Sequence, residues 1–328
     1  MKIEDTIKKE SYYLAEFKFE AGDFLRGLKV EYGTLGTPKY DERGHIINAI
    51  VYCHGWSGSY RSVRRIDEVT GPGEVIDTDK FFIISLSTLG SPGSACPSST
   101  GLGRNFPKYS IKDMVNFQMQ FLEEKFKIKH VLGVIGNSMG GFEAMTWATQ
   151  YPDYMDFTIS LVSSYKNAGH NYALYKCMNH LIMSDPDYND GKYTKKLART
   201  LSLAAELMYT FGQSKAYYRE LSKEEMEEEM NMMAEEGVLD DPNDIVFRNN
   251  ASLDYDVEKD LGNIKSKLLI IAIDGDEYFP PELDGIPMHN IVSDSELIVF
   301  KSLHGHIGSS ELSQISDKLE NFLKEFKN

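Results

Sequence analysis

The sequence predicts an α/β fold in which a mostly parallel sheet carries helices on both faces and an inserted helical cap. Short runs of β-branched and aromatic residues alternate with amphipathic helical patterns, which is the order expected of such a sheet. Several of these runs are apolar on both faces, as buried parallel strands must be. One long helical stretch interrupts the alternation, at residues 166–255.

The predicted sheet begins with an antiparallel hairpin at residues 17–36, which we expect at the sheet edge. Short apolar runs then predict the core strands. These runs are residues 47–53, 80–86, 129–136, 156–162, 267–273 and 296–300. Helices are predicted at residues 110–126, 139–151 and 310–326. In the last of these, apolar residues recur every three or four positions, which predicts one face packed on the core.

The helical stretch predicts a cap over the carboxyl edge of the sheet. Its clearest helices are 197–212 and 222–237. We therefore divide the chain into a first core part at 1–165, a cap at 166–255 and a second core part at 256–328. Methionine and tyrosine side chains of the cap either line a flexible pocket or pack between its helices. They are Tyr172, Met178, Met183, Met208 and Tyr209.

Composition excludes several classes of protein. The chain has 328 residues, of which 41% are hydrophobic, so it can bury a full hydrophobic core without disulfides or structural metals. Fifty acidic and 35 basic residues give a net charge of −15, opposite in sign to that of a nucleic-acid binder. No apolar run approaches the ~20 residues of a membrane span. Three cysteines without metal-like spacing, Cys53, Cys96 and Cys177, predict reduced thiols and no metal site. We expect a cytoplasmic protein without nucleic-acid or membrane partners, and a homodimer is left open.

The stretch VIGNSMGGFEA at 134–144 contains the pattern G-x-S-x-G, formed by Gly136, Ser138 and Gly140. A predicted strand precedes it and a predicted helix follows it, which is the context that a serine nucleophile requires. Such a turn holds the serine hydroxyl projecting from a tight bend, and its glycines allow close backbone packing. The alternative is a glycine-rich turn with an incidental serine.

A serine nucleophile needs a histidine base, which an acid must orient. Asp274 and Asp276 follow a late predicted strand, and His304 and His306 follow the last one, which gives the chain order Ser, Asp, His. Asp276 lies deeper in its loop and His306 precedes the final helix, so we select these two. The alternatives are a turn aspartate and a histidine that caps the last helix.

Two backbone amides are candidates for binding the oxyanion that forms when a serine attacks an acyl group. One belongs to Met139, directly after the proposed nucleophile. The other belongs to Trp56, in the loop 53–59 after a predicted strand. His54 stands at the end of that strand, where we expect a structural role.

Together with several longer segments, these residues resemble the homoserine O-acetyltransferase-like branch of the α/β-hydrolase superfamily. The resemblance implies the α/β-hydrolase fold, the catalytic set Ser138, Asp276 and His306, and Trp56 in the oxyanion loop. This chain has Asn137 where the family usually has glycine. The family's acceptor segment, an Arg-Phe-Asp run that leads to a Tyr-Leu pattern, corresponds here to VFRNNASLDYDV at 246–257, which keeps only Arg248. We expect Arg248 to contact substrate through a carboxylate. The similar segments are YGTLGTP, CHGWSG, GPGEVIDTDKFFII, FPKYSIKDMV, GNSMGGFEAMTWATQYPD, SDPDYNDGKY and IDGDEYFPP.

The leading hypothesis is a serine hydrolase that cleaves an ester or related acyl bond of a small molecule through an acyl-enzyme, with no cofactor. The alternative is an O-acetyltransferase that uses acetyl-CoA as co-substrate and homoserine or another small hydroxylated acceptor. The run Arg61, Arg64 and Arg65 favours coenzyme A if it faces the site, and otherwise forms a solvated surface. A third hypothesis is a catalytically inactive binding module, against which the intact Ser, Asp and His argue.

Overall fold

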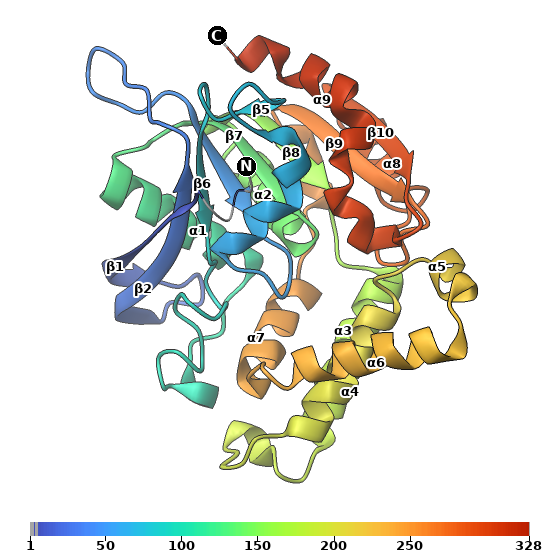
Figure 1. The fold of residues 1–328 in the computed structure, drawn as a ribbon. Helices are drawn as coiled ribbons and strands as arrows, with labels where there is room; N and C mark the ends of the chain where they lie inside the picture. The colour runs from blue at the N-terminus through green and yellow to red at the C-terminus, as the bar shows by residue number, and fades with distance from the viewer. Residues whose placement is uncertain (1–2, 4–5, 328) are drawn as a thin grey trace.

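A computed structural model describes residues 3 and 6–327 of the chain. Its centre is an eight-stranded sheet with the strand order β1-β2-β6-β3-β7-β8-β9-β10 (Figure 1). β1 pairs antiparallel with β2, and β2 pairs antiparallel with β6, whereas all other neighbours are parallel. The predicted α/β class with a mostly parallel sheet is therefore confirmed. The strands are β1 (Lys8–Lys18), β2 (Phe24–Leu35), β3 (Ala49–Cys53), β6 (Phe82–Leu86), β7 (Val131–Asn137), β8 (Met155–Leu161), β9 (Lys267–Asp274) and β10 (Ser295–Lys301), and the short β4 (Thr70–Gly71) and β5 (Ile76–Asp77) pair apart from the sheet.

The six core strands lie within two residues of their predicted ends. Five of them are buried on both faces over most of their length, whereas the edge strand β10 has exposed side chains at Glu296, Val299 and Lys301. Neighbouring residues of one strand belong to different cores: Ile50 of β3 packs in one apolar cluster and Val51 in the other. The hairpin prediction was too short, since β1 begins at Lys8 and not at residue 17. Only Leu14 and Phe17 of β1 are buried, so this edge strand lacks a continuous apolar run.

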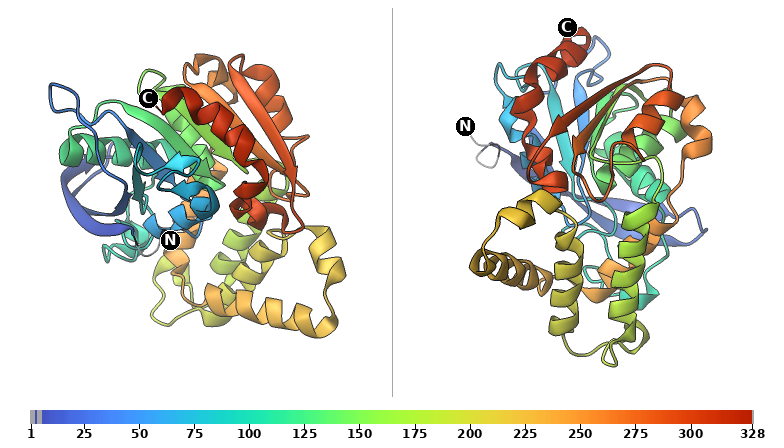
Figure 2. Two further views of the ribbon diagram at one scale, coloured as in Figure 1. Left: turned by 45° about the horizontal axis from the view of Figure 1, so that its top comes forward. Right: turned by 90° about the vertical axis from the view of Figure 1, so that its right-hand side faces the viewer.

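Helices cover both faces of the sheet (Figures 1 and 2). α1 (Ile111–Phe121) continues into a π-helical turn at Leu122–Phe126, and α2 (Met139–Gln150) follows β7 directly. α8 (Gly285–Ile291) lies between β9 and β10. Both α1 and α2 begin within a residue of the predicted positions.

The predicted helix at 310–326 is wrong as a single helix. Short 3₁₀ turns precede and follow α9, which spans only Ser316–Leu323. The break lies at Ile315, whose backbone angles (φ −124°, ψ 17°) are not helical. Its apolar stripe is nevertheless buried, because Ile315 and Leu319 both pack into the core.

The remaining helices lie together between β8 and β9, at one end of the sheet (Figures 1 and 2). Among them, α4 packs on α6, and α3 packs on both α4 and α7. Within residues 3 and 6–327, every helix is too short or too polar to span a bilayer. These helices are α3 (Gly169–Ser184), α4 (Ala198–Thr210), α5 (Lys215–Glu220), α6 (Lys223–Gly237) and α7 (Pro242–Leu253).

Candidate active site

Ser138 occupies the tight turn between β7 and α2. Its φ of 57° and ψ of −121° lie where residues other than glycine are rarely found. The turn is held by two hydrogen bonds: Ser138 donates its N–H to the Leu161 carbonyl at 2.9 Å, and Ser163 Oγ donates to the Ser138 carbonyl at 2.7 Å. A Cβ on Gly140 would lie 2.1 Å from the Cys53 carbonyl oxygen, so this position admits only glycine. The surrounding backbone therefore fixes the strained serine.

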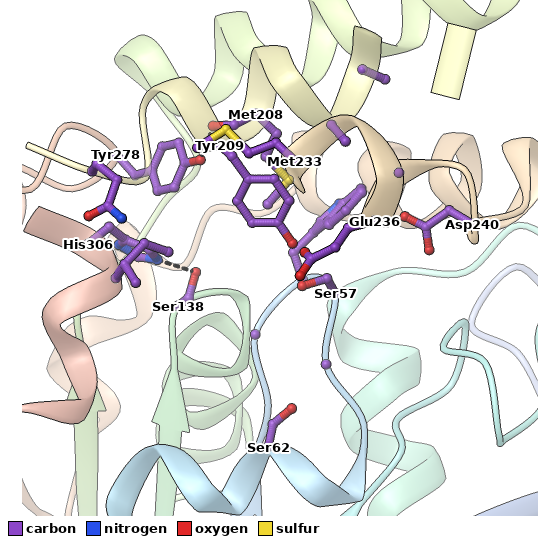
Figure 3. A pocket seen from close by; sticks show the side chains of 18 of the residues that line it. Ser57, Ser62, Ser138, Met208, Tyr209, Met233, Glu236, Asp240, Tyr278 and His306 are labelled. Carbon is purple, nitrogen blue, oxygen red and sulfur yellow. Dashed lines mark hydrogen bonds between the residues drawn. The ribbon is translucent and has the colours of Figure 1, made fainter. Parts of the chain in front are cut away.

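The Ser138 hydroxyl meets a histidine and an aspartate in line. His306 Nε2 lies 2.9 Å from Ser138 Oγ (Figure 3). His306 Nδ1 lies 2.8 Å from Asp276 Oδ2. The other carboxylate oxygen of Asp276 accepts the backbone N–H groups of Tyr278 at 2.8 Å and Phe279 at 3.1 Å. This loop thus fixes the carboxylate, which in turn orients the imidazole with Nε2 toward the hydroxyl.

The other members of the two candidate pairs lie elsewhere. Asp274 is exposed at the end of β9, with its carboxylate 3.8 Å from Lys301 Nζ. His304 directs Nδ1 toward Gln213 Oε1 at 3.2 Å and packs beside the Tyr217 ring. Of the four residues considered from sequence, the structure brings Asp276 and His306 to Ser138.

Two aromatic rings that sequence reasoning did not single out enclose His306. The Tyr278 ring lies edge-on at 4.7 Å from the imidazole, and the Phe279 ring lies at 5.7 Å. Tyr278 Oη donates to the Met208 carbonyl of α4, and this bond joins the loop that carries Asp276 to the inserted helices. Burial raises the pKa of Tyr278 well above its ordinary value, so the phenol remains a donor. The only sequence signal was that both aromatic residues follow Asp276 by two and three positions.

The two proposed oxyanion donors come from segments next to Ser138, namely the start of α2 and the loop after β3. Met139 is the first residue of α2, and the N–H groups of a helical first turn have no partner within the helix. The loop after β3 passes close by, since a Cβ on Gly55 would lie 3.4 Å from Ser138 Cβ. Trp56 follows in this loop and lines the cavity above Ser138.

His54 has the structural position expected for it. Its Nδ1 lies 2.7 Å from the Gly55 carbonyl, and its Nε2 accepts the Thr88 N–H at 3.1 Å. Burial lowers the pKa of His54 to about 4, and the nearby Arg248 charge adds to the effect. The neutral imidazole therefore links the backbone of the loop after β3, at Gly55, to the backbone after β6, at Thr88.

Arg248 does not occupy the position expected of a substrate contact. It is 1% exposed, and its guanidinium lies over the Trp56 ring, 4.2 Å from the centroid. Among the described residues, Arg248 is not one of those that line the cavity at Ser138. Its Nε and Nη2 have no hydrogen-bond partner among the described residues. The cation thus lies behind Trp56, whose indole N–H donates to Asn249 Oδ1 at 2.7 Å.

Ser138 and His306 open into a cavity of about 570 Å³ between the core and the inserted helices (Figure 3). Met178, Met208 and Tyr209 line it, as one of the two alternatives for these residues anticipated. Met183 and Tyr172 do not, because they point outward and are 57% and 42% exposed.

Polar side chains line other parts of the cavity. Tyr209 interacts with Ser57 of the oxyanion loop and with Glu236 of α6, and its pKa is raised to about 12 by burial and by that carboxylate. Arg64 and Arg65 also reach the cavity wall. Arg61 instead packs on the Tyr60 ring, at 5.8 Å from the centroid. Among the described residues, no cluster of three metal-ligating side chains occurs.

Comparison with known proteins shows extensive similarity. The model of the alpha/beta hydrolase fold family matches residues 48–305. A protein named "Probable acyltransferase" from Methanothermobacter thermautotrophicus is 48% identical, over 95% of this chain and 97% of the relative. A homoserine O-acetyltransferase from Methanohalophilus mahii is 28% identical, over 97% of this chain and 72% of the relative. A probable esterase from Corynebacterium glutamicum is 26% identical, over 93% of this chain and 91% of the relative.

Solved structures share the same fold. An acetylester hydrolase from Corynebacterium glutamicum superposes with a TM-score of 0.86 at 23% identity, over 97% of this chain and 96% of the other. A homoserine O-acetyltransferase from Bacillus anthracis gives a TM-score of 0.85 at 24% identity, over 97% and 98% of the two chains. Named esterases and acyltransferases thus share one architecture with this chain.

Proposed function

Because this chain belongs to the α/β-hydrolase fold family, in its homoserine O-acetyltransferase-like branch, we propose that it transfers acyl groups through a covalent intermediate on Ser138. The observation that carries the proposal is the line of hydrogen bonds from Ser138 through His306 to Asp276. A fixed carboxylate, a histidine and a strained, projecting serine are the parts that nucleophilic acyl transfer requires.

In the first half-reaction, Ser138 Oγ attacks the acyl carbonyl carbon while His306 Nε2 takes the hydroxyl proton. The imidazolium that results is stabilised by Asp276, which accepts from Nδ1. The oxyanion of the tetrahedral intermediate accepts the N–H groups of Met139 and Trp56. Collapse expels the leaving alcohol, which receives the proton from His306, and leaves the acyl group on Oγ.

In the second half-reaction, water attacks the acyl-enzyme and His306 removes its proton. The acid product then leaves and Ser138 regains its hydroxyl. We favour water because a zwitterionic acceptor needs fixed, buried charges that only the correct ligand satisfies. Arg248, the one cation retained in the acceptor segment, supports this choice, since it is stacked behind Trp56. The proposed function is therefore hydrolysis of an ester or related acyl bond in a small molecule.

A second candidate function is O-acetyl transfer from acetyl-CoA to homoserine or another small hydroxylated acceptor. One observation favours it: Arg64 and Arg65 line the cavity wall, where guanidinium groups can bind the phosphates of coenzyme A. Arg65 also donates to the Ile307 carbonyl at 3.3 Å, next to the catalytic histidine. The name of the 48% identical relative points the same way.

We also propose that residues 166–255 form a cap that closes the site above the core parts 1–165 and 256–328. The mutual packing of helices α3, α4, α6 and α7 between β8 and β9 supports this division, and Tyr278 joins the second core part to α4. The free thiols of Cys53, Cys96 and Cys177 support a cytoplasmic location. Whether the protein forms a homodimer is left to a measurement of its mass in solution.

Product analysis tests the proposal. The protein is incubated with acetyl-CoA, with and without homoserine, and separately with short-chain nitrophenyl esters. We expect nitrophenol and free acid from the esters, and little O-acetylhomoserine by mass spectrometry. Acetyl transfer to homoserine well above the rate of hydrolysis would instead establish the second candidate.

A further inference from the structure

We propose that the cavity binds an acyl chain of six carbons or more, which extends from Ser138 along the inserted helices. The inference rests on the proposed function, because it requires the acyl group to be attached to Ser138. It goes further by naming the class of acyl group and the wall that selects it.

The size of the cavity is the first argument. At about 570 Å³, it lies in the range of sites that enclose a drug-sized ligand. An acetyl group has only two carbons, so it would leave most of this space to water. The cavity continues from Ser138 between the core and helices α4 and α6, where a longer chain can follow it.

The chemistry of the wall is the second argument. The inserted helices α3, α4, α6 and α7 contribute apolar side chains to the cavity. Five of these side chains belong to one buried apolar cluster: Met178, Leu201, Ala204, Met208 and Ile245. Met208 and Met233 lie on this wall, on the side of the inserted helices (Figure 3). Methionine is flexible and polarizable, so it adapts to a chain of irregular conformation. The apolar wall consists of Met178, Leu201, Ala204, Ala205, Met208, Met233 and Ile245.

The third argument concerns two acidic side chains of the cavity, Glu229 and Glu236, which already have hydrogen-bonding partners within the protein. Glu229 accepts from Tyr217 Oη, and Glu236 interacts with Tyr209. Tyr217 belongs to α5, and Tyr209 lines the cavity from α4 beside Met208. Glu229 and Glu236 therefore do not need a cationic ligand, and the wall beside them presents apolar surface to an acyl chain.

Burial of the chain sets the size of the expected effect. Each buried methylene contributes enough transfer free energy for about a fourfold gain in kcat/KM. With partial burial, we expect hexanoyl and octanoyl esters to exceed the acetyl ester by at least about tenfold in kcat/KM. In each turnover, Oγ displaces nitrophenolate and water then releases the fatty acid, so the assay needs no other reactant.

Two variants test where the chain lies, each with a matched control. Met233→Asp places a charge in the apolar wall, and Met183→Asp places the same charge at an exposed methionine of α3 outside the cavity. We expect the octanoyl-to-acetyl ratio of kcat/KM to fall at least about tenfold in Met233→Asp, because an unpaired charge beside the chain is unfavourable. The ratio should stay within about twofold in Met183→Asp. Met208→Ala, compared with Met183→Ala, should widen the cavity and move the optimum to longer esters.

The outcomes separate this inference from the proposed function. Preference of the wild-type protein for the acetyl ester would overturn the inference and leave the proposed function intact. A long-chain preference that neither Met233→Asp nor Met208→Ala alters would overturn the placement of the chain. Absence of turnover with every ester and acyl-CoA would overturn the proposed function itself. Met208→Ala keeps the test decisive if Met233→Asp does not fold.

Discussion

Replacement of Asp276 by asparagine should remove most of the activity while leaving the fold intact. The carbonyl oxygen of the new amide can still accept the N–H groups of Tyr278 and Phe279, as Oδ1 of Asp276 does. The NH₂ group of the amide then faces His306 Nδ1, which must become an acceptor. The imidazole proton moves to Nε2, and the histidine can no longer take the proton of Ser138.

The Ser-His-Asp mechanism loses ~10⁴ in kcat when this tautomer is imposed. That factor corresponds to about 5 kcal/mol of transition-state stabilisation. The assay is kcat/KM with a nitrophenyl ester, and thermal unfolding serves as the check on folding. Asp274→Asn is the matched control, because Asp274 lies exposed at the end of β9, two residues before Asp276, and it should lose less than about threefold. More than a tenth of wild-type activity in Asp276→Asn, or an equal loss in both variants, would refute the assignment of the acid.

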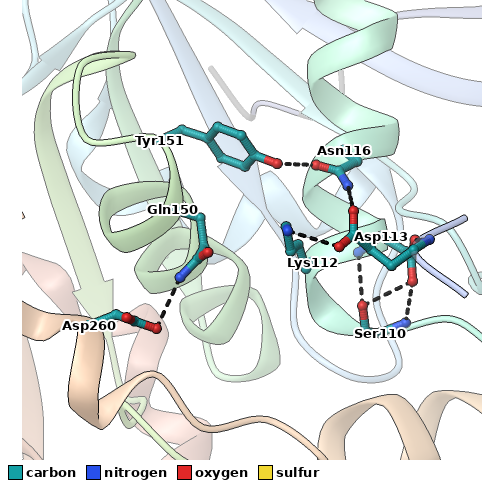
Figure 4. A network of polar contacts seen from close by, with 8 residues as sticks. Ser110, Lys112, Asp113, Asn116, Gln150, Tyr151 and Asp260 are labelled. Carbon is teal, nitrogen blue, oxygen red and sulfur yellow. Dashed lines mark hydrogen bonds and ion pairs between the residues drawn. The ribbon is translucent and has the colours of Figure 1, made fainter. Parts of the chain in front are cut away.

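Two further predictions concern stability. Burial raises the pKa of Glu143 to about 8, although Thr88 and Gln118 donate to its carboxylate. Because the unfolded state ionises near pH 4.5 and the folded state near pH 8, the stability contribution of Glu143 is present below pH 4.5 and is lost as the pH rises to 8. Glu143→Gln should therefore show a flatter Tm between pH 5 and 8, and an unchanged slope would contradict this pKa. Ser110 caps α1 by accepting the Asp113 N–H (Figure 4), so Ser110→Ala should lower the free energy of urea unfolding by ~1 kcal/mol, whereas no loss would show that the cap is dispensable.

The sequence was most informative where burial forces a simple pattern. Strands such as β3 and β6 are buried at every position, so each appears as an unbroken apolar run with clear ends. The turn at Ser138 was recognisable because close backbone packing admits only glycine at Gly140. The chain order of serine, aspartate and histidine then followed from the order of the strands.

Features that depend on distant contacts were not predictable in this way. The carboxylate of Asp276 is oriented by two amides of its own loop. Only its position two residues beyond Asp274 favoured it in the sequence, and these amide contacts could not be predicted. Arg248 carries a charge that suggested a ligand contact, yet its helix turns it onto Trp56. Tyr278 reaches the Met208 carbonyl, 70 residues away along the chain, and sequence alone contains no sign of that contact.

The central claim is that Ser138 is the nucleophile, and covalent labelling tests it most directly. A fluorophosphonate probe is added to the folded protein, and the labelled peptide is identified by mass spectrometry. We predict one adduct, on Ser138, which is absent in Ser138→Ala and forms far more slowly in His306→Ala. Ester turnover by the wild-type protein without a label on Ser138, or turnover retained by Ser138→Ala, would contradict the account.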